Sequence, residues 1–393
     1  MNESTKRVIS AAYRRAGGLY FAAYILVSVL YLAAVLFFVT MNPGKRDFVE
    51  YWAAQQQLMH GADPYDGPAI FQLERGAGFG NSGPLISYSP PVAWDLGLPL
   101  GLLSVRAGVV LWLLLMLTCV GASCRMIRVL AGRPRNRLHL LGYVFAPTMA
   151  CLMFGQIGIF FLLGIVLFLY LQNSRPFLAG AALLPLALKP HLFGPFGVAL
   201  LLWVVSRRVY PILAGFLVSF AVNCGLTLCF DPHIWTQYAD AMKKSVVLNV
   251  FPFSLSAMLR LFVARDAVWL QFLPVEIACA WTVWYFWTRR SRWNWMDHGM
   301  LVLLVSAMCA PYAWMTDEAM LLPAVLTGLY RAQKSPRSLM LLGAICGIAL
   351  IELVKGVSIT SRFYLWTTPA WLAWYLIAGR APDEQRVQEA TGT

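Results

Sequence analysis

Long apolar runs, separated by short charged or Pro/Gly-rich segments, follow one another along the chain from residue 19 to residue 379. A helix needs about 20 predominantly apolar residues to cross the hydrocarbon core of a bilayer. Several runs reach that length, and others fall a few residues short of it. The pattern predicts about twelve transmembrane helices, at residues 19–40, 106–130, 138–154, 157–173, 176–190, 192–206, 209–230, 267–288, 298–315, 318–331, 338–355 and 363–379.

The composition also indicates a membrane protein. Of the 393 residues, 59% are hydrophobic and 12% are charged, and the mean hydropathy is +0.64. Soluble domains are about 45–50% apolar and about 25% charged, and a soluble chain of this length lacks the interior to bury so much apolar surface. We therefore expect an all-α polytopic membrane protein that forms a single integral membrane domain over residues 1–393.

The charge pattern predicts the orientation of the chain. Lys and Arg number 31 against 18 Asp and Glu, a formal charge of +13. The basic residues lie in short clusters between apolar runs, which is typical of membrane topology rather than of nucleic-acid binding. If residues 1–18 are cytoplasmic, twenty of the 31 Lys and Arg residues fall on the cytoplasmic side. We expect a multi-pass protein of the cytoplasmic (inner) membrane, with a cytoplasmic tail over 381–393 and no nucleic-acid partner.

The sequence contains no pattern typical of a metal or redox site. The eight cysteines lie in or beside apolar runs without a Cys-x-x-Cys pair, and the five histidines are scattered. No Asp-x-Asp pair occurs that would hold a metal on a nucleotide diphosphate. We expect neither a metal nor a cofactor.

Two long polar and aromatic segments, residues 41–105 and 231–267, interrupt the pattern on the predicted outer side. Long loops in a compact protein are usually functional. In the first, Gly61 is a stop signal that follows apolar residues at helical spacing. These residues predict an interfacial helix in the headgroup plane; they are Phe48, Tyr51, Trp52, Leu58 and Met59. The second loop also has a membrane-surface composition.

Polar residues from several segments map to the outer face, which predicts a cavity that opens outward. Outer helix ends also need polar residues, so any single residue has this simpler explanation. The set comprises Asp47, Glu50, Asp63-Pro64-Tyr65-Asp66, Tyr88-Ser89-Pro90-Pro91, Gly155-Gln156, Lys189-Pro190-His191, Tyr312, Asp317, Glu318 and Arg362.

Short motifs in these segments occur in the order seen in a known family. They are Asp47-Phe48-Val49-Glu50-Tyr51-Trp52, Gly61-Ala62-Asp63-Pro64-Tyr65-Asp66, Tyr88-Ser89-Pro90-Pro91, Gly155-Gln156, Leu188-Lys189-Pro190 and Pro311-Tyr312-Ala313-Trp314. Over about residues 40–330 the chain resembles glycosyltransferase family 87. That family contains polyprenyl-phosphate-mannose-dependent mannosyltransferases and belongs to the GT-C superfamily, so the resemblance implies a GT-C-like fold.

The resemblance also implies the reaction. A sugar, mannose or similar, would pass from a polyprenyl-phosphate donor to a lipid or glycan acceptor at the outer face, with inversion and without a metal. By carry-over of the family's first-loop aspartate, Asp47 would be the general base. Asp47 and Glu50 also fit a helix capping box, and capping alone would explain them.

A lipid-phosphate leaving group requires cationic donors to stabilise its charge. Lys189, His191 and Arg362 are the candidates for binding the donor phosphate, although Lys and Arg near helix ends often only snorkel to the membrane surface. The expected substrate-binding residues are Glu50, Tyr51, Trp52, Tyr65, Tyr88, Gln156, Tyr312 and Asp317. After the Pro-x-x-Trp motif, related enzymes often have a histidine, whereas this chain reads Trp314-Met315-Thr316-Asp317-Glu318. Capping of the helix that follows is an equally good explanation for Asp317.

Two other functions fit the same composition. A transporter or lipid flippase would use the same outer cavity, but such proteins place their irregular polar residues near the bilayer midplane. A non-catalytic envelope scaffold would give no reason for Asp47, Lys189 and Arg362 to converge. Proximity of these three residues therefore distinguishes the enzyme from both alternatives.

Overall fold

The computed structural model describes residues 47–80, 82–92, 97–245, 254–333 and 335–391. The predicted cytoplasmic N-terminus and the first predicted span, residues 19–40, lie outside these ranges. Within them, all regular elements are helical. The α-helices are α2 (Phe48–Met59), α3 (Gly67–Gly76), α4 (Val105–Leu130), α5 (Ala146–Phe154), α6 (Gly158–Leu171), α7 (Pro176–Ala181), α8 (Gly194–Arg207), α9 (Tyr210–Phe230), α10 (Ile234–Lys244), α11 (Leu255–Val263), α12 (Leu273–Arg289), α13 (Met300–Cys309), α14 (Leu322–Ala332), α15 (Pro336–Val354) and α16 (Thr367–Thr391).

Short helical turns connect many of these helices. The 3₁₀ turns are Leu98–Leu102, Leu138–Tyr143, Leu184–Leu188, Pro190–Leu192, Val268–Gln271, Arg290–Arg292, Met315–Leu321 and Arg362–Tyr364, and Trp295–Gly299 forms a π-helical turn.

Three helices in the described ranges, α4, α9 and α15, are long and apolar enough to cross a membrane. Other apolar helices, such as α6 and α8, are shorter. The chain is thus an all-helical membrane protein, and the count of about twelve spans stays a prediction.

Several predicted spans are interrupted in the structure. The run predicted over 176–190 divides into α7 and the turn Leu184–Leu188, and the run over 318–331 starts as a 3₁₀ turn before α14. Prolines explain these breaks, since Pro185 stands in the first turn of Leu184–Leu188 and Pro323 in the first turn of α14. Proline has no N–H to donate and clashes inside a helix, but it fits the first turn. Hydropathy alone does not register these breaks.

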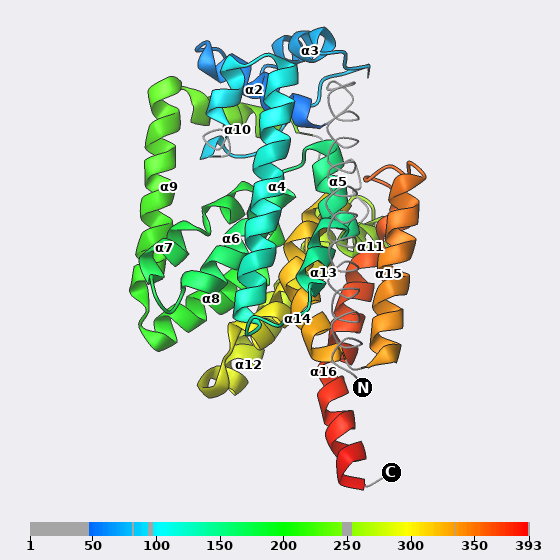
Figure 1. The fold of residues 1–393 in the computed structure, drawn as a ribbon. Coiled ribbons are helices and arrows are strands. Elements are labelled where there is room, and N and C mark those ends of the chain that lie inside the picture. The colour runs from blue at the N-terminus through cyan, green and yellow to red at the C-terminus, as the bar shows by residue number, and fades with distance from the viewer. Residues whose placement is uncertain (1–46, 81, 93–96, 246–253, 334, 392–393) are drawn as a thin grey trace, which may run out of the picture.

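Three helices of the two long loops gather at one end of the molecule. Figure 1 shows α2, α3 and α10 at the top, whereas the C-terminal end of α16 extends from the bottom. Helix α4 connects the two ends and packs against α6. This end of the fold therefore holds α2, which carries the candidates Glu50, Tyr51 and Trp52.

Helix α2 forms where the sequence predicts it, and protein covers its apolar face. It ends at the predicted stop, where Gly61 adopts φ +68°. Its residues Phe48, Val49 and Leu58 are all buried at 0% exposure. A Cβ on Gly108 of α4 would lie 3.2 Å from the Phe48 ring, so the small residue on α4 allows close approach. The position of α2 in the headgroup plane stays a prediction.

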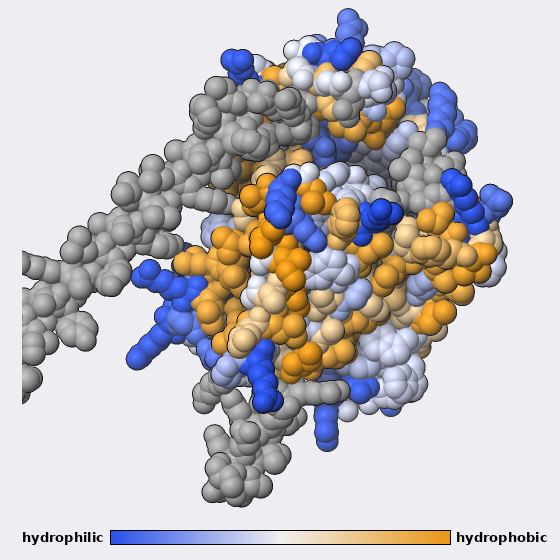
Figure 2. Space-filling view, turned by 90° about the vertical axis from the view of Figure 1, so that its right-hand side faces the viewer, coloured by the Kyte–Doolittle hydropathy of each residue, from blue (hydrophilic) through white to orange (hydrophobic). Residues whose placement is uncertain are grey.

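The outer surface of the helical body is apolar where a membrane would surround it. Helix α15 exposes Met340, Ile348, Ile351 and Val354, each at least half accessible. The face on which α15 lies carries a broad hydrophobic band with hydrophilic residues above and below it (Figure 2). Such a patch in contact with water would be very costly, so it agrees with a membrane location.

Candidate active site

The carboxylate of Asp47 is held by a side chain more than a hundred positions away. Gln156 Nε2 donates to Asp47 Oδ2 at 2.6 Å, and Tyr51 OH donates to Gln156 Oε1 at 3.0 Å. The Asp47 side chain makes no capping bond to α2, although it stands at the N-cap position. The capping alternative for Asp47 is therefore wrong. The Gln156 amide, with both ends engaged, fixes one oxygen of this carboxylate.

The turn between α5 and α6 places Gln156 at this position. Gly155 ends α5 in the left-handed conformation, with φ +76°, and Trp112 Nε1 donates to its carbonyl at 2.8 Å. A Cβ at Gly155 would lie only 2.7 Å from Phe48 Cβ. Glycine is thus required both for the backbone conformation and for close approach to α2.

Lys189 and Asp317 form a second polar pair. Lys189 Nζ lies 2.7 Å from Asp317 Oδ1, and the side chains are 15% and 2% exposed. Asp317 Oδ2 also accepts from the backbone N–H of Trp314 at 3.0 Å. Asp317 does not cap the predicted span 318–331 from its start; it lies inside the turn Met315–Leu321, and its carboxylate accepts from the backbone N–H of Trp314 at the start of that turn. The ion pair with Lys189 is an additional contact that the sequence did not predict.

Local backbone geometry directs Lys189 into the site. Lys189 joins two 3₁₀ turns with φ −138° and ψ 66°, outside the helical region. The following Pro190 disfavours a helical conformation at Lys189. The chain therefore bends at this point, close to the predicted boundary between the spans 176–190 and 192–206.

Burial and charge shift the acidic groups of α2. Burial raises the pKa of Asp47, while the Gln156 hydrogen bond and the Lys189 charge oppose this shift. Burial, together with the nearby Asp47 carboxyl group, raises the pKa of Glu50 to about 8. Since Lys189 acts on both groups, the ion pair lies within electrostatic range of α2. Near neutral pH, Glu50 is therefore mainly protonated.

His191 is half-buried beside Tyr312. The His191 ring stacks on Tyr312 with ring centroids 3.8 Å apart. His191 Nε2 is buried and has no hydrogen-bond partner among the described residues. Burial lowers the pKa of His191 to about 3, so this ring is neutral and contributes no charge to a phosphate. As a cationic phosphate ligand, His191 is therefore disfavoured.

Trp52 and Tyr65 have structural contacts. Trp52 Nε1 donates to the carbonyl of Leu103 at 3.0 Å, and Tyr65 OH donates to the carbonyl of Ser89 at 2.9 Å. The Tyr65 ring also packs against Tyr238 of the second long loop, at 5.6 Å between centroids. Tyr88 is half-buried beside this group. These contacts connect the two long loops.

Arg362 is not brought into the Lys189–Asp317 pair. It is exposed on the turn Arg362–Tyr364 and forms no ion pair within the described part of the chain. Of the three residues expected to converge, Asp47 and Lys189 are within electrostatic range of each other, whereas Arg362 stands on a separate surface turn.

Sequence reasoning did not select Glu318 as a site residue. Glu318 is 5% exposed, and its carboxylate accepts hydrogen bonds from side chains of α16. The available signal was the acidic pair Asp317-Glu318 at the edge of an apolar run. A buried carboxylate is costly unless it is well paired, so two adjacent acids there would have drawn attention to both positions.

Within the ranges that the structure covers, no group of three or more His, Cys, Asp or Glu side chains is placed to hold a metal ion.

Comparison with known proteins gives one family match. The model of glycosyltransferase family 87 matches residues 88–311. No curated protein and no solved structure matches the chain. Gln156 and Lys189 fall inside the matched segment, Asp47 precedes it and Asp317 follows it. Because the match covers more than half of its length, the chain belongs to glycosyltransferase family 87.

Proposed function

We propose that this membrane glycosyltransferase transfers a sugar, mannose or a similar one, from a polyprenyl-phosphate donor to a hydroxyl of a lipid or glycan acceptor. The observation that carries the proposal is the carboxylate of Asp47, held by Gln156 within electrostatic range of the Lys189–Asp317 pair. A base and a cation close together are what a displacement with an anionic leaving group needs. Family membership favours this enzyme over a transporter or flippase.

In the proposed reaction, Asp47 accepts the proton of the acceptor hydroxyl as its oxygen attacks C1 of the donor sugar. The bond between C1 and the phosphate oxygen breaks, and its electron pair stays on the phosphate. Attack from the side opposite the leaving group inverts the configuration at C1. Gln156 orients the base, since its amide bonds both Asp47 and Tyr51.

Lys189 stabilises the negative charge that develops on the leaving phosphate. Its ammonium group has three donors, and one is engaged by Asp317. The others remain available to phosphate oxygens. Because this cation supplies the charge stabilisation, we propose that transfer proceeds without a metal.

We also propose a GT-C-like topology of about twelve spans, with both termini cytoplasmic and the site at the outer face of the cytoplasmic membrane. Two facts support this orientation. Helices α2, α3 and α10, from both long loops, lie at one end of the molecule, and the end of α16 lies at the other (Figure 1). The excess of basic residues in the predicted cytoplasmic segments agrees with it.

The decisive experiment is an assay with purified protein, synthetic polyprenyl-phosphate mannose and a lipid acceptor extract, with products identified by mass spectrometry. We expect a product heavier than the acceptor by one hexose, formed equally well in the presence of EDTA. Parallel reactions contain a nucleotide sugar as the donor. Transfer from the nucleotide sugar alone would overturn the proposed donor.

A further inference from the structure

Tyr51 of α2 has its hydroxyl directed at another side chain of the proposed site. The residue is 4% exposed, and its hydroxyl donates to Gln156 Oε1 at 3.0 Å. The other end of the same amide, Nε2, donates to Asp47 Oδ2 at 2.6 Å. Three side chains thus form a chain of hydrogen bonds that ends on the proposed base. The proposed reaction gives Tyr51 no task of its own.

The charge of Asp47 determines the direction of this chain. A carboxylate only accepts hydrogen bonds, whereas an amide donates at one end and accepts at the other. Nε2 must therefore face Asp47, and Oε1 must face Tyr51. With the amide turned over, its oxygen would lie against a carboxylate oxygen with no hydrogen between them, which is unfavourable in a buried site. A donor at Oε1 prevents this arrangement.

The Tyr51 hydroxyl is suited to be that donor. Burial, together with the nearby Glu50 and Asp47 carboxyl groups, raises the pKa of Tyr51 well above its ordinary value, so the hydroxyl keeps its hydrogen. Glu50 lies within reach of the same hydroxyl and is mainly protonated near neutral pH. A protonated carboxyl group is a donor, so it can donate to the Tyr51 oxygen and leave the Tyr51 hydrogen to Gln156.

Helix α4 fixes both partners of the bond between Tyr51 and Gln156. The Tyr51 ring stacks on Trp112, with ring centroids 6.1 Å apart and 29° between the ring planes. Trp112 is 2% exposed, and its indole N–H donates at 2.8 Å to the carbonyl of Gly155, the residue directly before Gln156. Because one buried side chain holds both partners, packing defines the position of the hydroxyl relative to the amide.

We propose that Tyr51 is a positioning residue: its hydroxyl fixes the orientation of the Gln156 amide, which in turn holds Oδ2 of Asp47. Oδ1 is then the oxygen that takes the proton of the acceptor hydroxyl. Tyr51 contacts no reacting atom and acts only through Gln156. The proposal rests on the proposed function, because it assigns a task within the same reaction.

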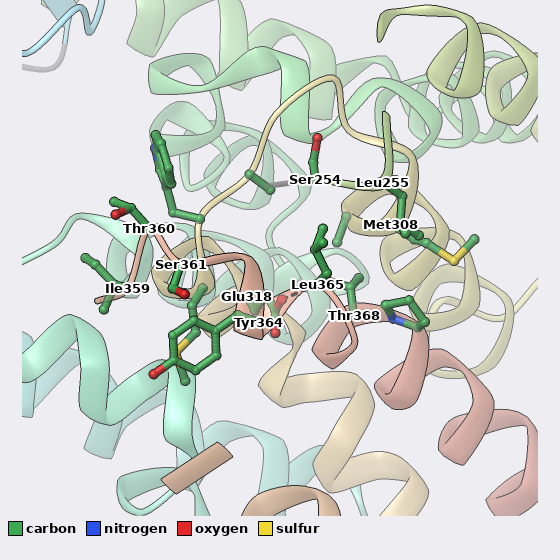
Figure 3. A pocket seen from close by; sticks show the side chains of 15 residues that line it. Ser254, Leu255, Met308, Glu318, Ile359, Thr360, Ser361, Tyr364, Leu365 and Thr368 are labelled. Atoms are coloured by element: carbon green, nitrogen blue, oxygen red, sulfur yellow. Dashed lines mark hydrogen bonds between the residues drawn. The ribbon is translucent and has the colours of Figure 1, made fainter. Parts of the chain in front are cut away.

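Three variants separate this role from a merely structural one. Tyr51→Phe keeps the stacked ring and removes the hydroxyl, and Gln156→Leu removes the amide. Tyr364→Phe is the matched control, because Tyr364 is 5% exposed and its hydroxyl donates to the carbonyl of Val357 at 3.3 Å. Figure 3 shows the Tyr364 hydroxyl directed away from Glu318. We expect similar melting temperatures for the two Phe variants.

The first measurement needs no turnover. Dicyclohexylcarbodiimide reacts with protonated carboxyl groups inside membrane proteins, and fragment mass spectra of the labelled peptide distinguish Asp47 from Glu50. The Gln156 hydrogen bond lowers the pKa of Asp47, so its loss raises the pH at which labelling of Asp47 is half-maximal. We expect this midpoint to rise by about one pH unit in Gln156→Leu, by less in Tyr51→Phe, and not at all in Tyr364→Phe.

Combined variants test whether Tyr51 acts through Gln156. Two changes along one path are non-additive, so Tyr51→Phe should add no shift in the Gln156→Leu background. In the Glu50→Gln background it should shift the midpoint as before. Lys189, which also acts on Asp47, is unchanged throughout. The proposal is overturned by no shift in Tyr51→Phe alone, by an equal shift with and without Gln156, or by a shift that requires Glu50.

The second measurement is sugar transfer. We expect the kcat of Tyr51→Phe to fall by about five- to tenfold with an unchanged donor KM, and Tyr364→Phe to keep wild-type values. An unchanged kcat of Tyr51→Phe at every pH would contradict the positioning role. If the purified wild type transfers no sugar from a polyprenyl phosphate, the proposed function fails, while the labelling midpoints still decide whether Tyr51 acts on Asp47 through Gln156.

Discussion

At the scale of residues, the proposed chemistry depends on contacts between side chains that are far apart in the sequence. Gln156 reaches Asp47 across 109 positions, and Lys189 reaches Asp317 across 128. The sequence analysis selected Gln156 for substrate binding and Lys189 for phosphate binding, and it predicted neither contact. The local pattern at Asp47 fitted a helix cap and the family resemblance implied a base; the contact to Gln156, with no capping bond, favours the base.

Asp47→Asn keeps the size of the side chain and removes its ability to accept a proton. General-base catalysis contributes about 100-fold or more to rate, so we expect kcat to fall by at least about 100-fold. The donor KM should change little, because Lys189 is intact. Product formation by the purified variant is the measurement. Transfer at close to the wild-type rate would show that Asp47 is not the base.

The acidic limb of the pH profile should reflect the raised pKa of Asp47. An unperturbed aspartate has a pKa of about 3.9, and burial moves that of Asp47 upward. Since the base works only when deprotonated, activity is lost on acidification at a higher pH than for an exposed aspartate. Lys189 lowers this pKa, so Lys189→Met should move the limb of log kcat/KM further upward in pH as well as reduce its height.

Glu50→Gln is the control for this pH profile. The pKa of Glu50 is about 8, so a base at this position would give a limb near that pH. We expect the acidic limb to remain in Glu50→Gln. Its disappearance there would assign the base to Glu50 instead of Asp47.

At the scale of elements, prolines and glycines set where helices end and how closely they approach. The α2 boundary at Gly61 could be predicted from the sequence, because a glycine after an amphipathic run is a local signal. The breaks before α8 and α14 lie close to the predicted boundaries at residues 190–192 and 315–318, whereas the break between α7 and the turn Leu184–Leu188 falls inside one apolar run, so hydropathy does not predict it. Lys189 and Asp317 lie in the non-α-helical turns that precede α8 and α14.

Gly155→Ala should destabilise the protein and displace the site. Alanine in the left-handed conformation costs about 1–2 kcal/mol, and the added Cβ would lie 2.7 Å from Phe48 Cβ. We expect a lower melting temperature in detergent and a lower kcat, because Gln156 follows directly. Gly343→Ala on α15, whose Cβ would meet no atom within 4 Å, is the control and should lose neither. Equal behaviour of the two variants would contradict this account.

At the scale of the whole molecule, an apolar body separates two ends that carry hydrophilic residues (Figure 2). The apolar surface of α15 and α9 requires a nonaqueous surrounding, and helices α2, α3 and α10 of the long loops lie together at one end (Figure 1). A single orientation in the membrane then determines which side supplies the substrates.

Epitope tags at the two ends of the molecule test this orientation. We expect a tag inserted after Gly80, in the loop beyond α3, to bind antibody on intact spheroplasts of the expression host. A tag inserted after Arg135, between α4 and α5, should bind only after permeabilisation. Both tagged proteins must retain wild-type sugar transfer. The reverse pattern of labelling would place the site on the cytoplasmic side.

The sequence by itself determined the helical membrane class, the bounds of α2 and the residues from which a site could be built, because periodicity, breakers and charge placement are local properties. Only the tertiary structure decided that Asp47 bonds Gln156, that Lys189 pairs with Asp317, and that α16 side chains bond Glu318. Each of these contacts depends on how separate helices pack against one another. It also decided that protein covers the apolar face of α2, because Phe48 fits closely against Gly108 and Gly155.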